Sequence, residues 1–85
     1  MSYFVYILRS LGYPRTYVGQ TDDMSSRVEL HNSGKVRSTR AYRPWEIIYC
    51  EEFGTRADAM KREKWLKTRM GRKFIKEISS KKTKV

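Results

Sequence analysis

The sequence predicts one α+β domain in which helices flank a small three-stranded antiparallel sheet, in the order ββαβαα. Length is the first observation, because 85 residues can build one modest core and no second folded unit. The second is a set of three short β-prone runs, and the third is the turn, cap and helix signals between them. We expect the domain to span residues 1–80, followed by a disordered basic tail at residues 81–85.

The first two strands are predicted to form a hairpin. Residues 3–9 are apolar and rich in aromatic and β-branched side chains, which favours a largely buried strand. Residues 11–14 contain a glycine and a proline and are typical of a turn. A second β-prone run follows at residues 16–19, so a longer loop would join the two strands.

The first helix is predicted over residues 24–32. Residues 21–23 precede it and offer side-chain acceptors for its first N–H groups. Gly34 lies just past its end, a position at which glycine commonly terminates a helix. Residues 35–44 are basic and show no periodicity, so we expect a loop that closes at a proline.

A third strand and two further helices complete the predicted order. Residues 45–53 have an apolar centre and form the third strand. Thr55 opens a segment that resembles a capping box, with an aspartate in place of the usual glutamate. The helix that it starts is expected to run to about Thr68. Gly71 would then separate this helix from the last one, at residues 72–79.

The chain is strongly basic, and its charge is concentrated in the last third. Lys and Arg number 19 against 9 Asp and Glu, which gives a formal net charge of +10. Residues 1–55 contribute +1 and residues 56–85 contribute +9. This asymmetry is typical of proteins that bind nucleic acid. A membrane is disfavoured because no helix pairs a basic face with a strong apolar one. A solvated basic surface without a partner is the simpler alternative.

Several function classes lack the residues that they require. The longest apolar runs are far shorter than the roughly 18 residues of a membrane span. The single cysteine, Cys50, cannot form an internal disulfide, and no Cys/His cluster provides a zinc site. The sequence also lacks a glycine-rich phosphate loop and a paired-histidine metal helix. We therefore expect a reduced, cytoplasmic protein.

Four side chains are suited to phosphodiester chemistry. Arg27 and His31 are four residues apart on the predicted first helix and so share one face. The preceding hairpin carries Tyr6 and Tyr17. A guanidinium that binds phosphate, an imidazole and two phenols form a plausible cleavage set. Spacing alone favours the simpler interpretation, in which the helix pair is solvated and the tyrosines are half-buried strand residues.

Glu63 interrupts the apolar stripe of the predicted second helix. Ala59, Met60 and Leu66 surround it at helical spacing. An unpaired charge within such a stripe would be costly. The carboxylate could pair with a buried cation such as Arg27, or it could bind Mg²⁺, which proteins commonly hold with one or two carboxylates, phosphate and water. Composition leaves both explanations open.

The order of these residues resembles the GIY-YIG nuclease superfamily. It is most similar to the small stand-alone members, which resemble the amino-terminal domain of excinuclease C. The matching segments are Phe4-Val5-Tyr6-Ile7-Leu8-Arg9-Ser10 at the GIY motif, Tyr17-Val18-Gly19 at YIG, Thr21-Asp22-Asp23 through Arg27, His31 to Lys35, Arg40 to Glu46, Tyr49 to Phe53 and Ala59 to Lys67. Each motif is weak alone, but their order and spacing together are specific.

The chain departs from this family at three points. Phe-Val-Tyr replaces Gly-Ile-Tyr in the first motif, with Tyr6 kept as its tyrosine. Gln20 stands where the excinuclease has a lysine just after the second motif. Several larger family nucleases have an asparagine after the metal-ligand helix, whereas the one asparagine here is Asn32.

The resemblance implies a metal-dependent endonuclease that uses one divalent cation, Mg²⁺ or Mn²⁺. Carried over residue by residue, the resemblance implies that Glu63 is the metal ligand and that Arg27 stabilises the transition state. Tyr6 and Tyr17 would be the active-site phenols, and His31 would occupy the fourth site position. Gly19 would allow tight packing beside Tyr17. The general base is assigned jointly to Tyr17, Tyr6 and His31, with Tyr17 first.

The implied partner is nucleic acid, DNA before RNA, with a role in repair or recombination. We expect backbone contacts that are salt sensitive and weakly sequence specific, made by a monomer or weak dimer. The basic residues assigned to this surface are Lys35, Arg37, Arg40, Arg43, Lys61, Lys64 and Lys67. The alternative function, from a different class, is a non-catalytic nucleic-acid-binding module that keeps the same fold.

Overall fold

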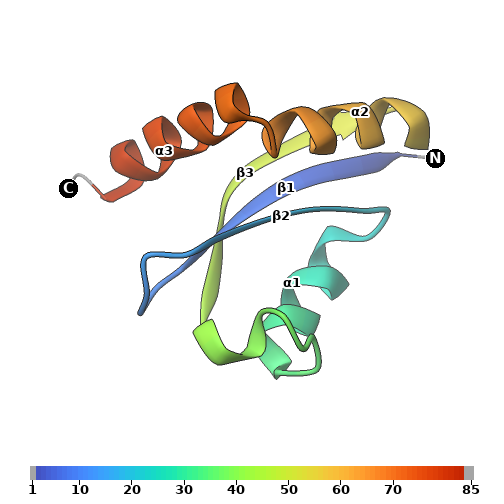
Figure 1. Ribbon diagram of the computed structural model, residues 1–85. Coiled ribbons are helices and arrows are strands. Elements are labelled where there is room, and N and C mark those ends of the chain that lie inside the picture. The colour runs from blue at the N-terminus through green and yellow to red at the C-terminus, as the bar shows by residue number, and fades with distance from the viewer. Residues whose placement is uncertain (1, 84–85) are drawn as a thin grey trace.

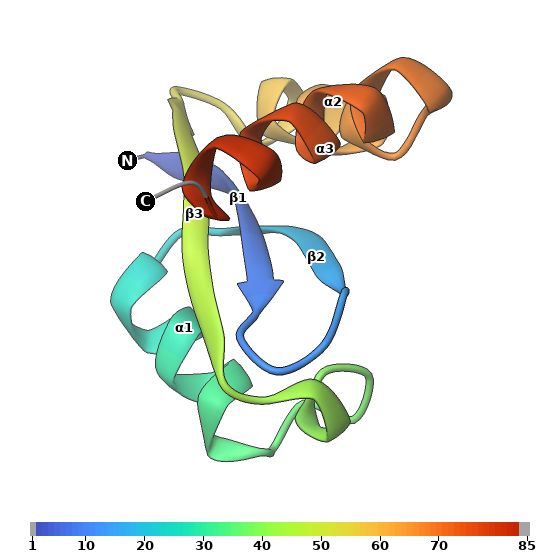
Figure 2. The same ribbon diagram turned by 90° about the vertical axis from the view of Figure 1, so that its left-hand side faces the viewer.

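A three-stranded antiparallel sheet lies between two helical layers (Figures 1 and 2). The computed structural model describes the backbone of residues 2–83 and the side chains of residues 2–80. The strands are β1 (Tyr3–Ser10), β2 (Thr16–Thr21) and β3 (Trp45–Phe53), in the spatial order β2-β1-β3. The helices are α1 (Met24–Ser33), the short 3₁₀ helix η1 (Arg40–Tyr42), α2 (Arg56–Leu66) and α3 (Arg69–Thr83). This architecture confirms the predicted α+β class and the order ββαβαα.

Strand β1 is the centre of the molecule and is buried on both faces. Its even-numbered residues Tyr6 and Leu8 pack on the side of α1, and Val5 and Ile7 pack on the side of α2 and α3. Side chains alternate between the two faces of a strand, so both faces of β1 must be apolar. This geometry accounts for its unbroken apolar sequence, and it divides the core into two clusters.

The larger cluster lies between the sheet and the pair α2 and α3. The smaller cluster lies between the sheet, α1 and η1. Buried residues of the larger cluster are Val5, Ile7, Ile48, Ala59, Leu66 and Ile75, and those of the smaller one are Tyr6, Leu8 and Trp45, with Tyr17, Met24, Val28 and Tyr42 packed against them. The figures show α2 and α3 above the sheet and α1 below it.

A β-bulge shapes the long strand β3. Ile7 pairs with Tyr49 and Leu8 pairs with Ile47, so Ile48 has no partner of its own in the ladder. Ile48 is nevertheless buried in the larger cluster. An extra residue in one strand bends it and increases its local twist. Figure 1 shows β3 curving from the side of α2 to the side of α1.

Helix α1 has the predicted caps and one contact that pattern analysis missed. Asp23 caps its start by accepting a hydrogen bond from the Ser26 N–H, and Gly34 ends it with φ of 88°. The Asn32 side chain donates to the Trp45 carbonyl at 3.1 Å and accepts from the Trp45 N–H at 2.7 Å. Asn32 thus joins the end of α1 to the start of β3, a structural role.

Several predicted boundaries are wrong. Helix α2 ends at Leu66 rather than near Thr68, and Gly71 lies inside α3 rather than separating two helices. The loop at residues 35–44 contains η1, and β2 continues to Thr21. Helix α3 starts at Arg69, because Thr68 caps it: the Thr68 hydroxyl accepts from the Gly71 N–H at 3.2 Å. The same helix runs through Thr83, so residues 81–83 continue it rather than forming a disordered tail. Residues 84–85 of the predicted tail lie outside the described residues.

No helix in residues 2–83 has both the length and the apolar character that crossing a bilayer requires. This finding agrees with the short apolar runs of the sequence.

Gly71 gives a testable prediction about the junction of α2 and α3. A Cβ at this position would collide with the backbone of Trp65 and Leu66, which cannot move as a flexible side chain can. We expect Gly71→Ala to lower the free energy of unfolding by about 3 kcal/mol, the upper end for overpacking. Urea unfolding followed by circular dichroism measures this change.

Gly54→Ala is the matched control. Nothing lies within 4 Å of a Cβ at Gly54, and its backbone is outside the left-handed region. This variant should unfold within about 0.5 kcal/mol of the wild type. Equal stability of the two variants would show that the α2–α3 junction tolerates a side chain.

Candidate active site

The register of β1 and β2 places two tyrosines beside a glycine on the α1 face. Tyr6 pairs with Gly19, and Tyr17 pairs with Leu8 on the same face. A Cβ at Gly19 would lie 2.6 Å from the Tyr6 hydroxyl oxygen and 2.9 Å from a Tyr17 ring carbon. The two ring centroids are 6.2 Å apart. The absence of a side chain at Gly19 is therefore what lets the two phenols lie together, as predicted for tight packing beside Tyr17.

His31 from α1 completes this aromatic group. Its Nε2 lies 3.0 Å from the Tyr6 hydroxyl, and its ring centroid is 4.7 Å from that of Tyr17. The side chain is buried, with 1% exposure. Because Nδ1 also has a partner, both ring nitrogens are engaged and neither faces solvent. If His31 acts as a proton acceptor, it must do so through Tyr6, the group that its Nε2 contacts.

Thr39 is a member of this network that sequence analysis missed. Its hydroxyl lies 2.9 Å from His31 Nδ1 and 3.4 Å from the Val36 carbonyl, and it is 1% exposed. Its carbonyl accepts from the Trp45 indole N–H at 2.9 Å. If the hydroxyl donates to Val36, Nδ1 carries the proton and Nε2 accepts from Tyr6. Thr39 lies in a segment without periodicity, so no local signal marked it.

Burial keeps the buried pair uncharged. Desolvation lowers the pKa of His31, and the charge of Arg27 lowers it further. Desolvation also raises the pKa of the Tyr6 phenol, and Tyr17 and Glu63 raise it further while Arg27 opposes them. At neutral pH the structure therefore holds a neutral imidazole against a protonated phenol.

Arg27 brings a positive charge to the α1 face of the sheet. It lies on α1 and is partly exposed, and its charge acts on both Tyr6 and His31. Within the described part of the chain it forms no ion pair. Its guanidinium is thus available to an anion, and it is not the partner of Glu63 that the sequence left open.

Glu63 lies across the sheet, at the edge of the apolar stripe of α2. Gln20 faces this side because it pairs with Val5, and its Nε2 donates to Glu63 Oε1 at 2.8 Å. The Lys67 ammonium lies 2.9 Å from Oε2. Met60, predicted within the apolar stripe, is 48% exposed, and the Glu63 side chain is 21% exposed. The carboxylate is therefore half-buried and paired, rather than enclosed by apolar groups.

The donor set around Glu63 fits a single oxygen-binding cation. The Gln20 amide oxygen is buried and has no hydrogen-bond partner among the described residues. Rotation of this amide would present a second oxygen beside the carboxylate, and Mg²⁺ prefers oxygen ligands and keeps several waters. Within the described residues, no group of three or more His, Cys, Asp or Glu side chains that could hold a metal ion forms, at Glu63 or anywhere else. A metal would thus depend on Glu63, Gln20, substrate phosphate and water.

The basic residues assigned to nucleic-acid binding differ in their availability. The Arg43 guanidinium covers Gly34 at the end of α1, and Lys67 pairs with Glu63. The other five are exposed and form no ion pair with a described residue: Lys35, Arg37, Arg40, Lys61 and Lys64.

Comparison with known proteins gives matches along nearly the whole chain. A family model described as the GIY-YIG catalytic domain matches residues 2–81. UPF0213 proteins of Staphylococcus aureus strains Mu3 and Mu50 are each 36% identical over 78 residues, covering 91% of this chain and 94% of theirs. The solution NMR structure of a UPF0213 protein of Bacillus halodurans is similar, with a TM-score of 0.55 and 28% identity, covering 92% of this chain and 85% of that one.

The buried imidazole predicts how stability depends on pH. Unfolded histidine titrates near pH 6.5, and the pKa of folded His31 is lower. As the pH falls through about 6.5, the histidine of the unfolded state is therefore protonated before His31 of the folded state. The free energy of unfolding should be greatest above this pH and fall on acidification, by at most about 1.4 kcal/mol per pH unit for one proton.

Urea unfolding at pH 7.5, 6.5 and 5.5 measures this slope. His31 is the one histidine of the chain, so His31→Gln is expected to flatten the dependence in this range. Groups facing His31 are Tyr6 from β1, Tyr17 from β2 and Arg27 from its own helix, none of which titrates there in free solution. The same slope in both proteins would assign the pH dependence to other groups.

Proposed function

Because this chain belongs to the GIY-YIG family of catalytic domains, a nuclease superfamily, we propose that it is a metal-dependent endonuclease. It would hydrolyse phosphodiester bonds of nucleic acid, DNA rather than RNA. The similarity to the excinuclease domain supports a role in repair or recombination. The cofactor proposed is one Mg²⁺ or Mn²⁺.

One observation carries this proposal: three of the predicted site residues lie together, with the Tyr6 phenol 3.0 Å from His31 Nε2 and its ring centroid 6.2 Å from that of Tyr17. Burial raises the pKa of this phenol, the Glu63 charge raises it further and the Arg27 charge opposes them. These groups come from four different elements, and Glu63 lies on the opposite side of the sheet. Tyr6, Tyr17 and His31 lie together on the α1 face of the sheet, and because β2 is an edge strand, we expect a ligand at this edge to reach both faces. A phosphate at this edge would have a guanidinium and a carboxylate on its two sides.

Arg27 and Glu63 would each help to stabilise the negative charge on the phosphate, in different ways. Phosphoryl transfer is catalysed mainly by positioning and by neutralising the charge on the phosphate oxygens. The unpaired Arg27 guanidinium would bind these oxygens directly. A cation held by Glu63 and the Gln20 oxygen would supply Lewis-acid stabilisation of the same charge.

The two tyrosines would serve the proton transfer from the attacking water. Tyr17 is partly exposed, so it is the phenol within reach of a water molecule and the first choice as general base. Tyr6 would orient the reacting groups through its hydroxyl, which His31 holds in place. Its pKa is raised, so Tyr6 stays protonated and serves as a hydrogen-bond donor.

A non-catalytic nucleic-acid-binding module is the second candidate, and one observation favours it. Both carboxylate oxygens of Glu63 already have protein partners, in Gln20 and Lys67. A cation must displace the Lys67 ammonium before it can bind there. If the ion pair persists in the presence of nucleic acid, the fold binds its ligand without cleaving it.

Cleavage of labelled DNA and RNA tests the proposal. Single-stranded, duplex and branched substrates would be incubated with Mg²⁺ or Mn²⁺. We expect Glu63→Gln to lower the cleavage rate at least about 100-fold, the loss typical of removing one group that stabilises transition-state charge. Its thermal unfolding should stay close to wild type, because the amide retains a hydrogen bond to Gln20.

Glu77→Gln is the matched control, since it neutralises an exposed carboxylate on α3 that forms no ion pair with the described residues. This variant should cleave at the wild-type rate. Cleavage that survives equally in both variants would come from a contaminant or another site. Binding without cleavage by the wild type would support the non-catalytic module.

A further inference from the structure

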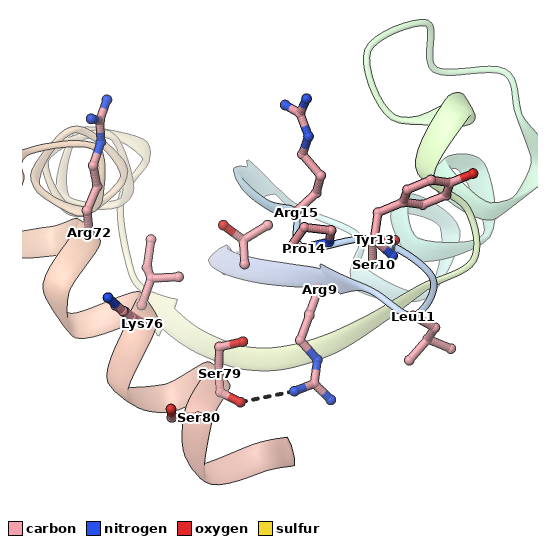
Figure 3. A pocket seen from close by; sticks show the side chains of 12 residues that line it. Arg9, Ser10, Leu11, Tyr13, Pro14, Arg15, Arg72, Lys76, Ser79 and Ser80 are labelled. Atoms are coloured by element: carbon pink, nitrogen blue, oxygen red, sulfur yellow. Dashed lines mark hydrogen bonds between the residues drawn. The ribbon is translucent and has the colours of Figure 1, made fainter.

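A pocket lies beside the proposed active site, on the other face of β2. It has a volume of about 620 Å³ and opens between the β1–β2 loop and α3, from Arg72 to Ser80 (Figure 3). This volume is in the range of sites for small ligands, about 300–1,000 Å³. It suits a nucleotide or two and is too small for a duplex.

The pocket carries uncompensated positive charge. Four of its lining residues are cationic, and no acidic residue is among the described residues that line it. Arg9 is neutralised by Glu46 and donates to the Ser79 carbonyl at 3.0 Å. Arg15, Arg72 and Lys76 form no ion pair with any described residue. Figure 3 shows Arg15 and Arg72 extending in the same direction from opposite sides of the space.

Like charges held together on a rigid frame repel each other, and a bound anion relieves this repulsion. Arg72 and Lys76 are four residues apart on α3, which is a destabilising spacing for two cations. Arg15 is fixed over the Tyr42 ring, 4.6 Å from its centroid. Arg72 and Lys76 are exposed, so the three cations leave positive charge at the pocket that a phosphate group would neutralise.

The loop side of the pocket adds an apolar and aromatic surface. Leu11 and Tyr13 are 59% and 51% exposed, and both line the pocket. The Tyr13 ring stands edge-on to Tyr42, with centroids 5.2 Å apart. Sites that bind single-stranded nucleic acid by base stacking combine aromatic side chains with cations in this way.

Hydrogen bonds hold this loop in place. The Ser10 hydroxyl accepts from the N–H groups of Gly12 at 3.3 Å and Tyr13 at 3.1 Å, and it donates to the Tyr42 carbonyl. The Leu11 N–H donates to the Pro44 carbonyl at 2.9 Å. The exposed side chains are therefore presented by a preformed loop, which reduces the entropy lost on binding.

Strand β2 separates the pocket from the proposed active site, and adjacent residues of this strand face the two of them. Thr16 lines the pocket, and Tyr17, the next residue, projects to the opposite face toward His31. Since β2 is an edge strand, a nucleic-acid strand can pass around it from one face to the other. A phosphate at Tyr17 and a neighbouring nucleotide in the pocket would then belong to one substrate strand.

We propose that this pocket binds an unpaired nucleotide of the substrate strand, next to the bond at the active site. This inference rests on the proposed function and specifies its substrate as a strand with a single-stranded segment. Phosphate oxygens contact Arg15, Arg72 and Lys76, and the base lies on Leu11 and Tyr13.

Binding is tested by fluorescence anisotropy without divalent metal, so that cleavage cannot interfere. The probes are a labelled single-stranded 12-mer, its blunt duplex, and that duplex with a single-stranded tail. Wild type should bind the first and third probes at least five-fold more tightly than the blunt duplex. The double variant Arg72→Gln/Lys76→Gln should lose this preference. Two lost phosphate contacts should reduce the slope of log affinity against log salt by about 1.4.

The double variant Arg69→Gln/Lys73→Gln removes the same charge from the same helix outside the pocket, and should keep the preference. Tyr13→Ala should weaken single-strand binding at least five-fold with the salt slope unchanged, which is the signature of stacking. Equal losses in the two double variants would overturn the pocket assignment while leaving nucleic acid as ligand. Equal competition by polyglutamate would also overturn it, in favour of a general polyanion site. Failure of every probe to bind would overturn both proposals.

Discussion

The double burial of β1 is the constraint on which the rest of this structure depends. A strand with helices on both faces must present apolar side chains on each, and here one of them is the phenol of Tyr6. A buried hydroxyl needs a hydrogen-bond partner, since leaving it unsatisfied costs roughly 1–3 kcal/mol. His31 supplies that partner, and Thr39 in turn satisfies His31. The same side chains therefore complete the packing of the smaller core and form the hydrogen-bond network of the candidate site.

The edge position of β2 explains how groups on opposite faces can act together. Tyr17 lies on the α1 face and Gln20 on the α2 face, yet both belong to a strand with one open side. Gly19 lies between them and leaves room for Tyr6. A ligand that approaches this edge meets the neutral aromatic group on one side and the Glu63 carboxylate on the other. The Glu63 charge still acts across the sheet on the Tyr6 phenol, where it adds to the effect of burial in raising the pKa.

The structure also sorts the basic residues by what they contact. The net charge of +10 is concentrated in the last third of the chain, and several of the basic residues make structural contacts. Arg62 pairs with Glu51 and lies over the Trp65 ring, 4.5 Å from its centroid. The cations left without a carboxylate include Arg27 at the candidate site and Arg15, Arg72 and Lys76 in the neighbouring pocket. We expect affinity for an anion to depend on where such unpaired cations lie around β2.

The sequence alone determined the class of fold, the order of elements, the caps of α1 and α2, and the family, because each depends on residues a few positions apart. It also predicted Gly19 and the site residues Tyr6, Tyr17, Arg27, His31 and Glu63, through their resemblance to a known pattern; their roles stay predictions. Only the tertiary structure decided the partners: Thr39 for His31, Gln20 and Lys67 for Glu63, and Trp45 for Asn32. Except for Lys67, these partners come from other segments of the chain, and strand register and burial bring them together. No periodicity or spacing encodes such a contact, because it exists only once the two faces of the sheet are covered.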